Sequence, residues 1–170
     1  GFAAFAFTNA DSLMLSFNGK KPLLGTNPIC FVCPNGENEP FCLDMSTTAY
    51  TFNKLLLLKK NNKKLPINFA ADKFGNMTLD PNMATSLYPS GGYKGFGLSI
   101  MVEILTAIFG NMPLDYELDP MYAKLRKNRQ ITQTYILFNI DAFTNKKQFI
   151  KNIKKLSKKV RSDKKVKNLP

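Results

Sequence analysis

A cluster of glycines around one lysine is the feature of the sequence that most directly suggests chemistry. In the stretch "SGGYKGFGLSIMVEIL", four glycines and Lys94 lie within residues 91–97, and an apolar pattern typical of a helix follows at once. The first amides of a helix are unpaired donors with partial positive charge, and glycines let a ligand approach the backbone. With the full charge of Lys94, the stretch predicts an anion site. The alternative is a glycine-rich turn with a solvated lysine.

Two familiar phosphate-binding motifs do not fit this stretch. In a P-loop, a Ser or Thr that binds magnesium follows the lysine, whereas Gly95 follows Lys94 here. A Rossmann fingerprint needs GxGxxG directly after a strand and an acidic residue about twenty positions further on. Any nucleotide site would therefore be of another kind.

Other polar side chains follow apolar strands. Asp44 and Ser46 end the segment "FCLDMS", and strand ends are where open α/β sheets place ligand-binding groups. An Asp followed by Ser and Thr is also a common helix N-cap, so this alternative stays open. The loops "TNADS" and "LGTNP" are polar in the same way. Glu103 lies among apolar helix residues, and a buried carboxylate there needs a partner.

The elements that must position these groups alternate between strands and helices. Strands are predicted over residues 1–7, 29–33, 41–46 and 133–141, and a loop over 19–29. Helices are predicted over 48–60, from Phe96 to near Gly110, and over 143–160. The last helix has an apolar face, which we expect to pack on its own domain, formed by Phe149, Ile150, Ile153, Leu156 and Val160. This mixture favours a layered α/β domain.

The positive charge of the chain is concentrated at its end. Of the net charge of +12, residues 146–170 supply +10, with eleven Lys or Arg and one acid, Asp163. A basic helix can bind nucleic acid, and that alternative predicts affinity that falls steeply with salt. However, only three of the 24 basic residues are Arg, the residue that grips phosphates and base edges with two hydrogen bonds. We therefore expect no nucleic-acid partner.

Metal, redox and membrane chemistry find little support in the sequence. The three Cys residues, without any His, cannot complete a four-ligand zinc site, so no metal is implied. The "CFVC" pair lies inside an apolar run instead of a strand-to-helix turn, where a redox pair gains a lowered pKa. No apolar run approaches the length of a membrane span, so we expect no membrane partner and a cytoplasmic setting.

Five motifs, taken in order, resemble one enzyme family. They are "FAFTNADSLM", "KPLLGTNPI", "LDMST", "ADKFGNMTLDP" and "SGGYKGFGLSIMVEIL". In order and spacing they resemble the malate/L-lactate dehydrogenase family, which includes ureidoglycolate dehydrogenase and 2,3-diketogulonate reductase. The resemblance covers residues 1–141 well and implies a non-Rossmann α/β fold, a layered mixed sheet with flanking helices. It also implies transfer of a hydride between NAD or NADP and a small 2-hydroxy or 2-oxo acid, in a homodimer.

The resemblance also implies roles for individual residues. Those it assigns to the cofactor are Ala10, Asp44, Met45, Ser46, Lys94 and Gly95. Thr26 and Asn27 are expected near the nicotinamide or the substrate. The turn at Lys94 would then face the strand end at Asp44 and hold the anionic part of the dinucleotide. Residues 1–141 would form the cofactor-binding core, and residues 142–170 a basic amphipathic helix on the same domain.

The sequence departs from the family pattern at both ends. The family's catalytic His, a proton donor, lies upstream of the segment that matches Gly1, so no catalytic residue is expected within this chain. The carboxy-terminal "KNLP" corresponds to a point just before a family "GE" that also approaches the cofactor. A truncated or degenerate remnant that only binds cofactor is therefore the alternative to an active dehydrogenase.

Overall fold

The computed structural model describes residues 1–121 and 128–164. The chain divides into two compact units. Unit 1 comprises residues 1–5, 31–43 and 136–170, and unit 2 comprises residues 6–30 and 44–135. The predicted division between residues 141 and 142 stays a prediction. Within the described ranges, no helix is both long and apolar enough to cross a membrane.

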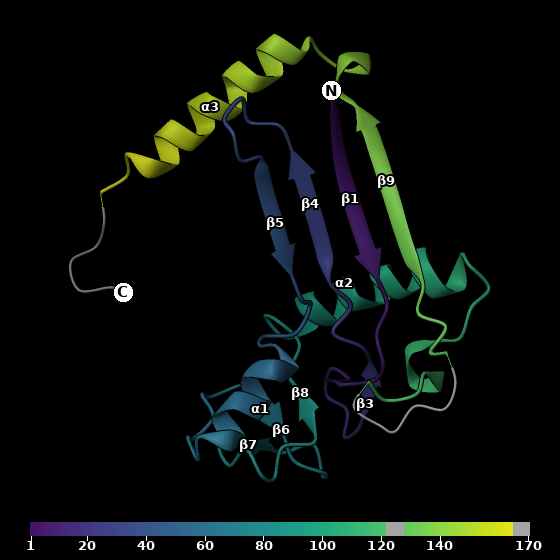
Figure 1. The fold of residues 1–170 in the computed structure, drawn as a ribbon. Helices are drawn as coiled ribbons and strands as arrows, with labels where there is room; N and C mark the ends of the chain where they lie inside the picture. Colours follow the sequence, from purple (N-terminus) through teal and green to yellow (C-terminus); the bar gives the residue numbers. More distant parts are fainter. Residues whose placement is uncertain (122–127, 165–170) are drawn as a thin grey trace. The chain divides into compact units, whose positions relative to one another are not determined.

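Four long strands form the first sheet. They are β1 (Phe2–Thr8), β4 (Ile29–Cys33), β5 (Phe41–Met45) and β9 (Gln133–Asn139), paired in the order β5-β4-β1-β9. Neighbouring arrows point in opposite directions in Figure 1. Their aromatic and β-branched residues favour extended backbone, as the sequence predicts. In β9, exposed residues alternate with half-buried ones from Gln133 to Leu137, which is the period of a strand covered on one face.

Unit 1 has a small apolar core. Ala3, Cys33 and Ile140 are its buried residues, and Phe149 and Ile153 of the last helix pack against them. This helix, α3 (Lys146–Arg161), follows the short 3-10 turn η3 (Ile140–Ala142) and begins at the side-chain cap of Asn145. The expected packing of its whole apolar face is wrong for the second half of the helix. Leu156 and Val160 are 62% and 67% exposed, because the core reaches only the first turns.

Unit 2 contains a second sheet made of short strands. These are β2 (Met14–Leu15), β3 (Pro22–Leu24), β6 (Ala70–Ala71), β7 (Met77–Thr78) and β8 (Ser86–Leu87), in the order β3-β2-β8-β6-β7. The prediction of a loop over residues 19–29 is wrong at β3, which pairs antiparallel with β2. The strand has only three residues and starts with a proline, so its pattern was too short to identify.

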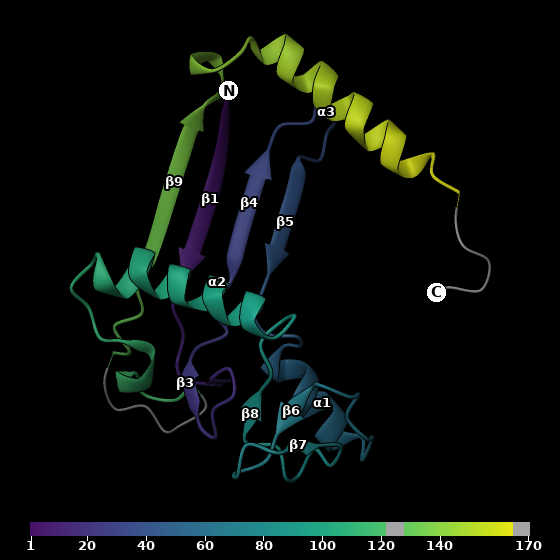
Figure 2. The same cartoon turned by 180° about the vertical axis from the view of Figure 1, so that it is seen from behind.

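Helix α1 (Phe52–Lys60) closes the apolar core of unit 2. Its Leu55 packs with the buried Leu65, Phe69 and Leu87, and Figure 2 shows α1 beside β6 and β7. The helix was predicted to start at residue 48 but begins after Thr51, whose hydroxyl accepts the N–H of Lys54 at 3.3 Å. A side-chain cap of this kind fixes the helix start.

The helix predicted after the glycine cluster is α2 (Tyr93–Glu103), which continues as the π-helical turn η1 (Ile104–Ile108). It begins three residues earlier than predicted and ends where expected. Its inner face buries polar residues, Ser99 and Glu103 among them, together with Val102. The 3-10 turn η2 (Asp115–Glu117) follows it in the chain.

Candidate active site

A cavity of about 360 Å³ in unit 2 collects residues from several separate stretches of the chain. Its walls include the end of β1 with the loop after it, the segment before β4, and the segment between β5 and α1 with the start of α1. It is also lined by Met121, Arg129, Ile131 and Gln133. We call this cavity the site hollow. Three of the residues that the sequence analysis assigned to ligand binding line it: Ala10, Thr26 and Ser46.

Asp44 lies beside the site hollow. It lines a smaller hollow of about 170 Å³, and Thr8, Pro28 and Gln133 line both cavities. The two hollows therefore adjoin, as expected for polar groups at the end of one strand. Met45 lies between Asp44 and Ser46 in sequence, is half-buried and lines neither cavity.

The glycine turn packs directly on the segment that follows β5. Gly95 is buried, and a Cβ atom there would lie 2.4 Å from the backbone nitrogen of Ser90 and 2.5 Å from the carbonyl oxygen of Thr47. That carbonyl accepts the backbone N–H of Ser90 at 2.9 Å. Only a glycine permits two backbone segments to approach this closely.

The rest of the turn is open to solvent. Lys94 is exposed and lines neither of the two hollows described above. Gly91 and Gly92, with φ of 60° and 66°, line another cavity of about 680 Å³. Because Gly92 is the N-cap of α2, no side chain caps the first amides of the helix. The turn thus offers backbone amides and a positive charge to an anion. Asp44 lines the smaller hollow and Lys94 lines neither, so the two residues share no cavity of the two described.

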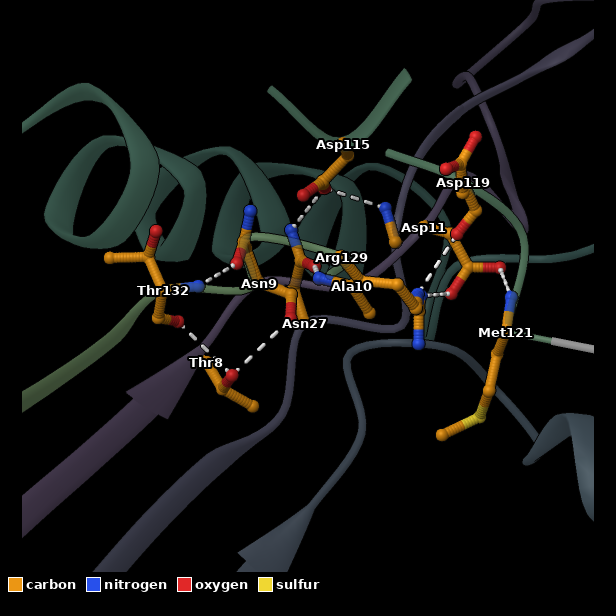
Figure 3. A network of polar contacts seen from close by, with 11 residues as sticks. Thr8, Asn9, Ala10, Asp11, Asn27, Asp115, Asp119, Met121, Arg129 and Thr132 are labelled. Carbon is orange, nitrogen blue, oxygen red and sulfur yellow. Dashed lines mark hydrogen bonds and ion pairs between the residues drawn. The ribbon is translucent and has the colours of Figure 1, made fainter. Parts of the chain in front are cut away.

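Asn27 is fully buried behind the site hollow. Its Nδ2 donates to Asp115 Oδ2 at 2.7 Å and to the carbonyl oxygen of Ser99 at 3.2 Å. Its Oδ1 accepts the backbone N–H of Ala10 at 3.1 Å (Figure 3). The side-chain amide of Asn27 therefore makes its hydrogen bonds within the protein. Asn27 does not line the site hollow and is hydrogen-bonded to one of the residues that do, Ala10.

Two buried carboxyl groups lie together beneath this network. Asp115 N–H donates to Glu103 Oε1 at 2.8 Å, so the partner that Glu103 needs is present. Burial raises the pKa of Glu103 to about 8, and the side chain of Asp115, with the charge of Glu117, adds to the rise. Glu103 is therefore largely neutral at pH 7, while a buried Asp115 carboxylate can accept several hydrogen bonds.

An ion pair closes one side of the site hollow. Arg129 and Asp11 both line it, and a guanidinium nitrogen of Arg129 contacts Asp11 Oδ1 (Figure 3). Arg129 Nε donates to the carbonyl oxygen of Asp119 at 2.9 Å, and Asp11 Oδ2 accepts the N–H of Met121 at 3.2 Å. Arg129 and Asp115 are not predictable from the sequence, because neither belongs to a recognisable motif and their partners lie 118 and 88 residues away.

The sequence profile described as "Malate/L-lactate dehydrogenase" matches residues 1–169. The chain belongs to the malate/L-lactate dehydrogenase family. Ureidoglycolate dehydrogenase (NAD(+)) of Escherichia coli (strain K12) is 31% identical over 149 residues, which are 88% of this chain and 43% of that protein. (2R)-3-sulfolactate dehydrogenase (NADP(+)) of Chromohalobacter salexigens is 42% identical over 109 residues, 63% of this chain and 33% of that protein. The family prediction is confirmed.

Solved structures confirm the predicted α/β fold. Sulfolactate dehydrogenase from Methanocaldococcus jannaschii matches with a TM-score of 0.88 and 28% identity over 99% of this chain and 48% of that chain. Malate dehydrogenase from Entamoeba histolytica matches with a TM-score of 0.88 at 24% identity, over 100% of this chain and 51% of that one. The chain thus spans about half the length of these relatives.

Proposed function

We propose that the protein is an NAD(P)-dependent oxidoreductase that transfers a hydride between nicotinamide and a 2-hydroxy or 2-oxo acid. The observation that carries the proposal is the family match over residues 1–169. The relatives named above include one NAD(+) and one NADP(+) enzyme, and both are dehydrogenases by name. The site hollow, with Ala10, Thr26 and Ser46 on its walls, supports the same function.

The residues at the glycine turn fit the anionic part of a dinucleotide. Gly91 and Gly92 place no side chain in front of α2, and the helix dipole favours negative charge there. Lys94 is exposed and adds a full charge. Gly95 also lets the turn pack on Thr47, because it has no side chain, and its expected contact with the cofactor stays a prediction.

The bound nicotinamide would supply or accept the hydride, which is chemistry that no side chain of the chain provides. The walls of the site hollow carry hydroxyl groups of Thr and Ser, side-chain amides, and the guanidinium of Arg129, which is paired with Asp11. Such groups suit the hydroxyl and carboxylate of a small hydroxy acid. The proton donor that ketone reduction requires is not assigned to any of these residues.

Replacing Lys94 by alanine is expected to weaken the binding of NADH or NADPH about tenfold, because a charge-assisted hydrogen bond is lost. Lys94→Arg keeps the charge and should retain most of the affinity. Fluorescence titration with each dinucleotide measures both variants. Lys60→Ala removes an exposed lysine at the end of α1 and is the control. An unchanged dissociation constant for Lys94→Ala would remove Lys94 from the site.

The same titration addresses the remnant alternative. Dinucleotide binding without turnover of lactate, malate or ureidoglycolate would favour a protein that has kept only the cofactor site. Turnover of one of them would establish the dehydrogenase and its substrate.

We propose in addition that the protein is a cytoplasmic homodimer. An exposed apolar stripe on α2, η1 and the residue after η1 supports a subunit interface of the dimer. It consists of Ile100, Met101, Ile104, Ile108 and Phe109. Sedimentation velocity measures the assembly directly, and a monomer at micromolar concentration would contradict it.

A further inference from the structure

The walls of the site hollow are held by one buried carboxylate that does not line it. Asp115 Oδ2 accepts the backbone N–H of Gly25 at 2.7 Å and Asn27 Nδ2 at 2.7 Å. The Asp115 side chain is completely buried. Hydrogen bonds to a buried carboxylate are short and strong, so residues 25–27 are fixed at both ends by the same oxygen.

We call the contacts of Asp115 with Gly25 and Asn27 the clamp. Further hydrogen bonds connect the clamp to three walls of the site hollow. Asn27 holds the backbone of Ala10. The carbonyl oxygen of Thr26, between the two clamped residues, accepts both the N–H and the hydroxyl of Thr47 at 2.9 Å. Thr47 directly follows Ser46. Ala10, Thr26 and Ser46 are thereby connected to Asp115, although the three residues are far apart in sequence.

The loop held by Asp115 leaves no room for a side chain at position 25. A Cβ atom on Gly25 would lie 2.3 Å from the carbonyl oxygen of Ala10 and 2.5 Å from Asn27 Oδ1. Asn27 itself has a φ of 28°, in the left-handed region that Asn tolerates better than most residues. The side chain of Asp115 compensates this unfavourable backbone with two hydrogen bonds.

We infer that Asp115 is a positioning residue of the site hollow, which sets the geometry of Ala10, Thr26 and Ser46 through Gly25, Asn27 and Thr47. Ligand binding then depends on a carboxylate that does not line the cavity. The identity of the ligand in this inference rests on the proposed function. The clamp itself rests only on the hydrogen bonds of Asp115.

The test compares Asp115→Asn, which keeps an acceptor but loses the charge, with Asp115→Leu, which has a similar shape and no acceptor. Dissociation constants for NADH and NADPH are measured by fluorescence at a temperature where each variant is folded. We expect about tenfold weaker binding for Asp115→Leu and a smaller loss for Asp115→Asn, since walls displaced by a fraction of an ångström no longer fit the ligand.

Leu65→Ala is the matched control, because it destabilises the core of the same unit without touching the clamp. It should leave the dissociation constants unchanged. Binding by Asp115→Leu as tight as in the unsubstituted protein, at equal or lower stability, would overturn the inference. If Asp115→Leu does not fold, Asp115→Asn decides in the same way.

A second measurement separates this inference from the proposed function. Amide resonances of Gly25, Ala10 and Thr47 in ¹H–¹⁵N spectra should shift in Asp115→Asn and keep their positions in Leu65→Ala. If the unsubstituted protein binds neither dinucleotide, the proposed function fails, and these resonances alone decide the clamp. If the amide resonances of Ala10 and Thr47 do not shift in Asp115→Asn, the inference that Asp115 positions these residues is overturned.

Discussion

Replacing Gly95 by alanine is expected to lower the free energy of unfolding by about 3 kcal/mol or more, within the range of severe single substitutions. The added Cβ would meet three backbone atoms, the nitrogen and oxygen of Ser90 and the oxygen of Thr47, at 2.4 to 2.5 Å. Backbone atoms cannot move aside as the end of a flexible side chain can. The substitution would therefore push the glycine turn away from the segment after β5 and weaken the 2.9 Å hydrogen bond between them.

Gly97→Ala is the matched control, on the same helix and two residues away. A Cβ at Gly97 meets no atom within 4 Å, and alanine favours the helix by about 1 kcal/mol over glycine. Urea unfolding of both variants should therefore give changes of opposite sign. Equal stabilities for the two variants would mean that the turn does not pack on Thr47.

This pair of glycines changes the interpretation of the motif. The cluster predicts an anion site, since glycines are frequent where a ligand approaches the backbone, with a glycine-rich turn as the alternative. The structure gives a packing reason for Gly95 and none for Gly91, Gly92 or Lys94, while the cofactor contact expected of Gly95 stays a prediction. A sequence cannot separate these causes, because both need the same missing side chain.

Long elements with a regular apolar pattern were predictable from the sequence. The strands β1, β4, β5 and β9 and the helix after the glycine cluster lie within a few residues of their predicted bounds. The two-residue strands of the second sheet were not, because such a short segment has no periodicity. They exist through pairing with distant segments, as β2 does with β8 over more than seventy positions.

The candidate site was predictable only in part, for the same reason. Ala10, Thr26 and Ser46 follow strands or precede them in recognisable loops, and they meet at the site hollow. The need of Glu103 for a partner could be inferred from its apolar surroundings. The partner is Asp115, which also holds Asn27. Both contacts depend on where η2 packs after α2 ends. No local pattern encodes that contact.

The pair of buried carboxyls predicts a pH dependence of stability that one substitution should abolish. The pKa of Glu103 in the folded protein is about 8, above its usual value of 4.5. Between these values the folded protein holds a proton that the unfolded chain has released. The contribution of Glu103 is thus most favourable below pH 4.5 and decreases, by at most about 1.4 kcal/mol per pH unit, as the pH rises towards 8.

Glu103→Gln keeps the shape, can accept the N–H of Asp115 and does not titrate. Its free energy of unfolding, relative to that of the unsubstituted protein, should therefore rise steadily between pH 5 and pH 8 in urea titrations. Glu39→Gln removes one carboxylate at an exposed position, and its difference should change little over the same range. A constant difference for Glu103→Gln would mean that Glu103 is ionised beside Asp115. Two negative charges would then lie side by side in the buried site beneath residues 25–27, where they repel each other.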